Sequence, residues 1–102
     1  MYFIESNSIE SNSDILAFGF SIAMSTLSRL IGDNIRAKRK NLNIKQDELA
    51  LLAEIDRSYM GRIERGEVNI TVDKLYQIAN TLKCEATDLL PEMNYVSSFQ
   101  TN

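Results

Sequence analysis

The sequence contains no histidine and only one cysteine, Cys84. Without histidine, the usual zinc sites and histidine acid–base catalysis are excluded. A single cysteine forms no disulfide within the chain, which predicts a protein of the reducing cytoplasm, and Cys84 is expected to be a small buried hydrophobic residue. The sequence also lacks a glycine-rich phosphate loop and any paired metal-ligand motif. We therefore expect no enzyme activity, no catalytic residue, no metal and no cofactor.

The chain of 102 residues has room for one domain with one modest hydrophobic core. Its net charge of −3 is unevenly distributed. Residues 1–23 contain three acidic residues and no basic one, residues 24–65 contain nine basic and six acidic residues, and residues 66–102 contain two basic and five acidic residues. A basic middle suits a protein with one DNA-facing surface, although charged faces are commonly only solvated.

The N-terminal segment, residues 1–23, allows three interpretations. Residues 1–14 contain the unit Ile-Glu-Ser-Asn-Ser twice and are rich in serine and asparagine, which predicts a disordered or loosely held arm. The apolar run over residues 15–24 is too short to span a bilayer comfortably, so it predicts a helix that packs on the domain or on a partner chain, with no membrane contact. Alternatively, the natural protein starts at Met24, and residues 1–23 derive from an upstream start codon.

Apolar periodicity predicts helices over the rest of the chain. The first runs from Leu27 to a basic last turn ending at Lys40, and the second covers Gln46–Ala53. The third covers Arg57–Arg65, after an N-cap at Asp56. A fourth follows the predicted N-cap Thr71, and a short fifth lies at Ala86–Leu90. Their expected buried faces are Leu27, Ile31 and Ile35; Leu49, Leu52 and Ala53; Met60 and Ile63; and Val72, Leu75, Ile78, Ala79 and Leu82.

Since no strand pattern is present, the fold is predicted to be all-α: a compact five-helix domain over residues 24–94, with a C-terminal tail at residues 95–102. Within it, Gln46–Arg65 has the spacing of a helix-turn-helix, with small Ala50 where two helices must approach closely. In that motif the second helix projects and enters a major groove about 12 Å wide. An ordinary helical hairpin without a ligand shares part of the same pattern.

Residues 28–90 resemble the Cro and repressor type of helix-turn-helix regulators, the Xre family. The resemblance rests on four stretches in the order and at the separations of that family: Ile35-Arg-Ala-Lys-Arg-Lys, Ile44-Lys-Gln-Asp-Glu-Leu-Ala, Tyr59-Met-Gly-Arg-Ile-Glu-Arg-Gly and Leu75-Tyr-Gln-Ile-Ala-Asn-Thr-Leu. The stretch from Asp56 to Gly66 is most similar to controller proteins of restriction-modification systems, while phage and plasmid repressors share most of it.

The sequence departs from the family pattern at two positions. Lys45 stands where Thr, Ser or Asn usually caps the second helix. Glu54 replaces the frequent turn glycine, so this position either tolerates strain or adopts a different turn.

The expected base contacts lie on the third helix. Arg57 is the first choice for base readout, because an arginine there can donate two hydrogen bonds to guanine O6 and N7. Ser58, Tyr59 and Arg62 lie on or near the same face and are further candidates for contacts with base edges, with Tyr59 alternatively half-buried in the core.

Phosphate contacts are expected from Gln46, Arg65 and Asn69. The resemblance assigns Gln46, at the start of the second helix, to a phosphate contact, and helix N-termini suit anions on physical grounds. The resemblance also implies that Arg39 and Glu64 form an internal salt bridge between the first and third helices, a structural role rather than one in DNA binding.

A domain of this size covers about half of a typical operator, which predicts a homodimer on a palindromic DNA site. The predicted dimer interface is Leu89, Leu90, Met93 and Tyr95, unless the tail folds back over its own core. We expect a transcriptional regulator whose partners are double-stranded operator DNA, a second copy of the chain and, for an activator, RNA polymerase. A phage- or plasmid-type repressor and a protein-binding helical module, such as an antitoxin-like or adaptor domain, are the alternatives.

Overall fold

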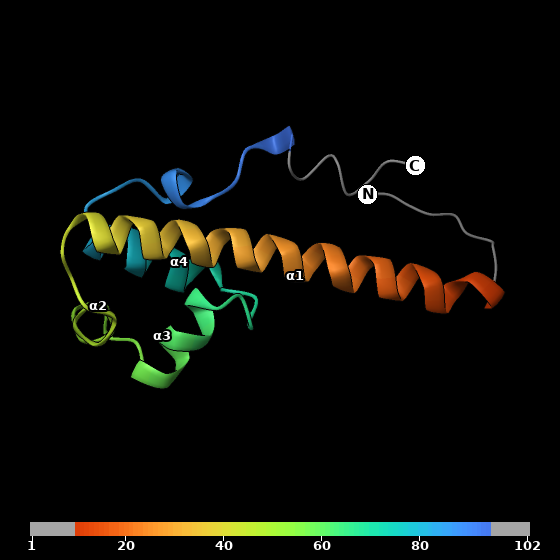
Figure 1. The fold of residues 1–102 in the computed structure, drawn as a ribbon, viewed down its shortest axis with the longest axis horizontal. Helices are drawn as coiled ribbons and strands as arrows, with labels where there is room; N and C mark the ends of the chain where they lie inside the picture. Colours follow the sequence, from red (N-terminus) through yellow and green to blue (C-terminus); the bar gives the residue numbers. More distant parts are fainter. Residues whose placement is uncertain (1–9, 95–102) are drawn as a thin grey trace.

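The computed structural model describes the backbone of residues 10–94 and the side chains of residues 26–94. The elements are α1 (Glu10–Asn41), α2 (Gln46–Ala53), α3 (Arg57–Glu64), α4 (Val72–Thr81) and a single 3-10 turn, η2 (Ala86–Leu89). Helix α1 separates η2 on one side from α2 and α3 on the other (Figure 1). The part of the chain that the structure describes contains no strand, which confirms the all-α prediction; the expected fifth helix is the turn η2.

Helix α1 is longer than the sequence pattern predicted. It begins at Glu10 and continues for 32 residues to Asn41, so it includes both the helix predicted from Leu27 and residues 15–24, which one interpretation made helical. This range contains no proline, and extending an existing helix costs far less than nucleating one. The helix therefore passes through the predicted boundary at residues 23 and 24, and its N-terminal part runs beyond the other helices (Figure 1).

The N-caps of α3 and α4 are the predicted ones. The Asp56 carboxylate accepts a hydrogen bond from the Tyr59 backbone N–H at 3.0 Å. The Thr71 hydroxyl accepts one from the Lys74 backbone N–H at 3.2 Å. Such caps satisfy donors at the helix start that otherwise lack partners within the helix.

Helix α2 begins without a side-chain cap from its N-cap residue, because the Lys45 ammonium has no acceptor atom. The Glu48 carboxylate instead accepts the Lys45 backbone N–H at 3.4 Å. Only one of the two hydrogen bonds of a capping box is therefore present, the one that satisfies the Lys45 backbone N–H. The first backbone N–H groups of α2 itself receive no side-chain cap from Lys45 and keep their positive potential.

Glu54 ends α2 in the left-handed conformation, with φ 59° and ψ 43°. Of the two alternatives for this position, the chain takes the strained one: the turn keeps the conformation that glycine adopts freely, although the residue has a Cβ atom. The turn brings the Ile55 backbone N–H to the carbonyl of Ala50 at 2.9 Å and leads directly into the α3 N-cap.

The hydrophobic core gathers residues from every element. Its members are Ile31, Ile35, Leu49, Ala50, Ala53, Ile55, Met60, Ile63, Leu75, Ile78, Ala79, Leu82, Ala86 and Leu89. Leu27 and Cys84 are partly buried and pack against it, and burial raises the pKa of the Cys84 thiol. This agrees with an apolar role for Cys84 rather than a reactive one.

Two predicted core residues are exposed. Leu52 is 56% exposed and Val72 is 68% exposed, so both predictions were wrong. Leu49, Ala50 and Ala53 already fill the face that α2 turns toward α3 and α4, and Val72 lies in the first turn of α4, where the chain enters from a loop. Periodicity identifies the apolar residues of a helix, but the neighbouring helices decide how wide a face they cover.

Gly32 permits a close approach of α1 to the end of α3. A Cβ atom at this position would lie 2.6 Å from the carbonyl oxygens of both Ile63 and Glu64. These are backbone atoms of a packed helix, so only glycine fits here without a shift of one helix against the other. This contact sets where the end of α3 lies along α1.

Glu54→Gly is expected to raise the free energy of unfolding by about 0.5–1 kcal/mol, since glycine removes the cost of the left-handed conformation but adds unfolded-chain entropy. Thermal or urea unfolding followed by circular dichroism measures this. Glu54→Ala is the matched control: it keeps a Cβ atom and should give no such gain. A decrease for the glycine variant would show that the turn is not strained.

Candidate nucleic-acid interface

The outward face of α3 is basic, while its other face lies in the core. Arg57, Ser58, Arg62 and Arg65 are exposed. Met60, Ile63 and Glu64, on the opposite side, are buried. Advancing about 100° per residue, the helix places the four exposed residues within a single arc. Three of the four predicted base contacts, Arg57, Ser58 and Arg62, therefore share one solvent-facing surface.

Tyr59 does not belong to this surface. It is half-buried and packs against the hydrophobic core, and the Lys74 Nζ lies 5.7 Å from the centre of its ring. At about 100° per residue, Tyr59 is turned roughly 200° away from Arg57. Of the two interpretations of Tyr59, the structure thus agrees with the half-buried one, and the ring contributes a cation–π contact between α3 and α4.

Gly61 lies on the same side of α3 as Arg57 and Arg65 but is buried, and the sequence analysis gave it no role. It follows Arg57 by four residues and precedes Arg65 by four, a spacing that places all three on one side of the helix. The Arg65 guanidinium lies over it: a Cβ atom on Gly61 would be 3.1 Å from Arg65 Nη1. The four-residue spacing from Arg57 and to Arg65 was the sequence signal that could have placed Gly61 on this side of α3.

Arg57 pairs with Asp47 of α2. Its Nη1 donates a hydrogen bond to Asp47 Oδ2 at 3.2 Å, and the two side chains are 73% and 65% exposed. Asp47 lies in the first turn of α2 and Arg57 in the first turn of α3, so this solvent-exposed contact joins the two helices.

Arg65 and Arg62 share a second carboxylate, Glu67, just beyond the end of α3. Arg65 donates from Nε to one Glu67 oxygen at 2.8 Å and from Nη2 to the other at 3.3 Å, while Arg62 Nε lies 3.9 Å away. The hydrogen bond that Arg65 donates to Glu67 lowers the pKa of Glu67 and raises the pKa of Arg65. All three arginines of the face thus have a carboxylate partner within the protein.

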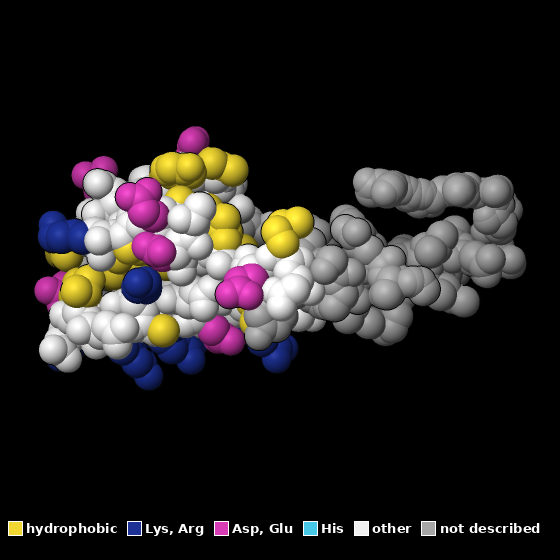
Figure 2. All heavy atoms as spheres, turned by 90° about the horizontal axis from the view of Figure 1, so that it is seen from above, with side chains coloured by type: hydrophobic (Ala, Val, Ile, Leu, Met, Phe, Trp, Pro, Cys, Tyr) yellow, Lys and Arg dark blue, Asp and Glu magenta, His cyan; other side chains and the backbone are white. Residues whose placement is uncertain are grey.

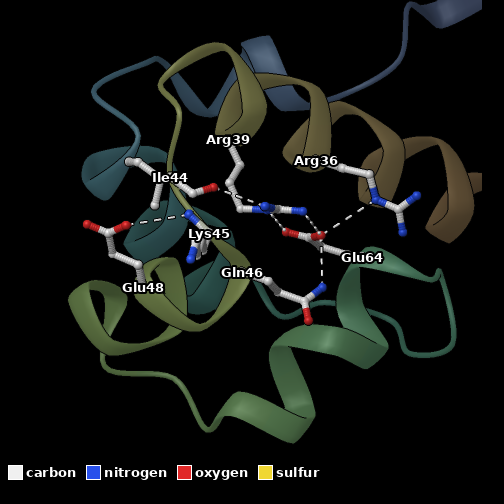
Figure 3. Close-up of polar contacts among 7 residues, drawn as sticks. All are labelled: Arg36, Arg39, Ile44, Lys45, Gln46, Glu48 and Glu64. Carbon is white, nitrogen blue, oxygen red and sulfur yellow. Dashed lines mark hydrogen bonds and ion pairs between the residues drawn. The ribbon is translucent and has the colours of Figure 1, made fainter.

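The carboxylate of Glu64 joins three helices behind this face (Figure 3). It is fully buried. Arg39 of α1 donates two hydrogen bonds to it, from Nε to Oε2 at 2.8 Å and from Nη2 to Oε1 at 3.0 Å. Gln46 of α2 donates from Nε2 to Oε1 at 3.0 Å. Arg36, also from α1, lies 3.6 Å from the same oxygen. The structure therefore brings together the pair expected to form a salt bridge and the Gln46 side chain expected at a phosphate.

The buried polar atoms of this cluster all have hydrogen-bond partners. Arg39 also donates from Nη1 to the Ile44 carbonyl at 3.0 Å, which ties α1 to the segment before α2. Among the described residues, no buried side-chain nitrogen or oxygen lacks a hydrogen-bond partner. A buried ion pair is stabilising only when it is satisfied in this way, and loss of one partner strands the other charge.

Asn69 is exposed, and a hydrogen bond from α1 holds its side chain. Its Oδ1 accepts a hydrogen bond from the Ser28 hydroxyl of α1 at 2.9 Å. With the oxygen engaged, the Nδ2 group is the one that Asn69 can offer to an acceptor such as a phosphate oxygen.

The residues predicted to form the dimer interface differ in their solvent exposure. Leu89 is completely buried in the core of its own chain, so its assignment to the interface was wrong: the η2 turn points this side chain inward. Leu90 and Met93 are 40% and 75% exposed, and Tyr95 lies outside the described residues. The face opposite α3 carries apolar and acidic side chains, whereas basic side chains gather along one edge (Figure 2).

No cluster of residues suited to a metal ion occurs among the described side chains. Within the described range, no helix is long and apolar enough to cross a membrane.

Comparisons with known proteins identify similar chains. Residues 35–89 match the family described as helix-turn-helix. The chain is 30% identical over 69 residues to the control protein C.SmaI of Serratia marcescens, a match covering 68% of this chain and 82% of that protein. It is 34% identical over 62 residues to the control protein C.BamHI of Bacillus amyloliquefaciens, covering 60% and 76%.

A solved structure is also similar. The restriction-modification controller protein C.AhdI from Aeromonas hydrophila aligns with a TM-score of 0.60 and 32% identity, over 62% of this chain and 96% of that one. The similar proteins named here are control and controller proteins rather than enzymes, in agreement with the sequence analysis.

Arg39→Ala is expected to lower the free energy of unfolding by about 3–5 kcal/mol, because it strands the buried Glu64 carboxylate. Arg36→Ala is the matched control: its side chain is 41% exposed, so its loss should cost less than about 1 kcal/mol. Urea unfolding curves of the two variants give the comparison, and equal losses would contradict the central role of Arg39.

Proposed function

This chain belongs to the helix-turn-helix family, as the resemblance predicted, and from that membership we propose that it is a transcriptional regulator that binds DNA in a sequence-specific manner. The observation that carries the proposal is the outward face of α3, where Arg57, Ser58 and Arg62 stand in solvent while the reverse of the helix is anchored in the core. A helix presented in this way fits the major groove.

Arg57 is the main base-reading residue in this proposal, with guanine as its partner. Planar guanidinium groups match guanine O6 and N7 with two parallel hydrogen bonds. Ser58 and Arg62 contact neighbouring base edges or phosphates from the same face. We assign no base contact to Tyr59, because its ring is held between the core and Lys74.

Phosphate contacts come from the flanks of α3. The N-terminus of α2 offers backbone N–H groups and positive helix potential beside Gln46. The hydrogen bond from Gln46 to Glu64 uses one of its two amide protons, so the other is available to a phosphate oxygen. Arg65 and the Nδ2 group of Asn69 complete this set of contacts.

We propose a homodimer on a partly palindromic operator. Two recognition helices related by a twofold axis can enter successive major grooves about 34 Å apart, which one copy cannot do alone. The exposed Leu90 and Met93 follow η2, which lies across α1 from α3 (Figure 1), and they support an interface there. Tyr95 remains a predicted member of it.

The finer proposal is a controller of a restriction-modification system, acting in the cytoplasm. Its support is the likeness to C.SmaI, C.BamHI and C.AhdI, each of which this chain covers over three quarters of its length or more. We do not extend the proposal to contact with RNA polymerase, since no described surface points to it.

A protein-binding helical module is the second candidate. It is favoured by the exposed apolar side chains of α2 and α4, which are Leu51, Leu52, Val72 and Tyr76. Such a module would not prefer one DNA sequence over another.

Selection of bound duplexes from a random pool, followed by titration at several salt concentrations, separates the two candidates. A DNA reader should enrich one palindromic sequence, with an affinity that falls steeply with salt. An absence of enrichment would refute the proposed function.

Arg57→Ala should relax sequence preference at one base pair in each half-site, with a loss of about 1–3 kcal/mol of discrimination and no loss of fold. Competition binding with single-base operator variants measures it. Equal weakening on every duplex would instead reassign Arg57 to a phosphate.

Gln46→Ala should weaken binding to all sequences by about ten-fold, since it removes a hydrogen bond to a charged phosphate without changing base readout. The same competition series checks this, with thermal melting to establish that the variant is folded despite the lost contact with Glu64. A change confined to one base pair would contradict the assignment.

A further inference from the structure

The arginines on the outward face of α3 meet their carboxylate partners in two different ways. Arg57 uses a single nitrogen, Nη1, toward Asp47. Arg65 uses two nitrogens, Nε and Nη2, toward the two oxygens of Glu67. Both arginines are exposed, so the difference lies in how much of each guanidinium is left for an outside ligand.

A guanidinium reads guanine by presenting two parallel N–H groups from one edge of its plane. A contact through Nη1 alone leaves a complete two-donor edge on Arg57, whichever proton of Nη1 is engaged. The contact of Arg65 instead consumes the edge formed by Nε and Nη2. Arg57 thus keeps its Nε–Nη2 edge open, whereas Arg65 keeps only the edge formed by Nη1 and Nη2.

We propose that Asp47 is a positioning residue that sets base specificity: it fixes the Arg57 guanidinium by one nitrogen and turns a free two-donor edge outward, toward guanine. This inference rests on the proposed function. It adds a specificity determinant on α2, outside the recognition helix, to the base-reading residues of α3.

The ion pair between Asp47 and Arg57 contributes little to the stability of the fold. With side chains 73% and 65% exposed, it is of the kind whose contribution to folding is close to zero, since water screens the charges and both side chains lose freedom. In a complex with DNA, water is excluded and the same contact strengthens. The ordering of a long arginine side chain before binding also reduces the cost of ordering it in the complex.

The charge of Asp47 acts on specificity in a second way. It lies in the first turn of α2, on the flank where the phosphate contacts are proposed, so it repels the DNA backbone whatever the sequence. Asp47 therefore lowers binding to random DNA while it favours binding where Arg57 meets guanine. Both effects widen the gap between specific and non-specific sites.

The test compares Asp47→Ala with Glu67→Ala in full-length protein, on the selected operator, on single-base variants of it and on random duplex. For Asp47→Ala we expect discrimination at the base pair read by Arg57 to fall about five-fold, while random-duplex binding rises. Glu67→Ala should raise binding to all duplexes alike. Asp47→Glu, which keeps the carboxylate, should restore discrimination, and thermal melting should be nearly the same for all variants.

A double variant completes the test. In an Arg57→Ala background, Asp47→Ala should no longer change discrimination at that base pair. Unchanged discrimination in the single variant, or a loss that persists without Arg57, would overturn the inference and leave the proposed function intact; the second result would mean that Asp47 reads a base itself. A wild-type protein with no sequence preference would overturn the proposed function and the inference with it.

Discussion

The buried carboxylate of Glu64 is the interaction on which this structure depends. A charge removed from water is tolerable only when its oxygens are fully hydrogen-bonded, and here the donors come from two other helices, Arg39 of α1 and Gln46 of α2. Arg39 donates to both oxygens, and Gln46 adds a second donor to Oε1. The carboxylate therefore links α3 to both α1 and α2, and these contacts constrain the position of α3 on the domain.

The carboxylates of this protein also decide which arginines remain available to a ligand. Glu64 holds Arg39 inside the domain, where it contributes to the fold. Asp47 and Glu67 hold Arg57 and Arg65 at the surface, where a partner can still approach them. The local arrangement of acids around α3 thus matters more for recognition than the net charge of −3, which taken alone argues against nucleic acid.

Much of the fold could be predicted because its signals are local. The range of α2 and the caps Asp56 and Thr71 follow from residues within four positions of one another. The wrong assignments, Leu52, Val72 and Leu89, each depended on what lies next to a helix rather than within it. The start of α1 was missed because apolar periodicity is weak in its first turns, while backbone hydrogen bonding continues regardless of which face is apolar.

The sequence by itself determined where α2, α3 and α4 lie and that Arg57, Ser58, Arg62 and Arg65 share the outward side of α3, since a helix fixes the direction of its own side chains. Family resemblance added the pairing of Arg39 with Glu64. Only the tertiary structure decided that Glu54 accepts a left-handed conformation, that Tyr59 turns to the core, and that Asp47 meets Arg57 from ten positions earlier in the chain. These outcomes depend on distances between helices, which arise from packing and cannot be read from neighbours in the sequence.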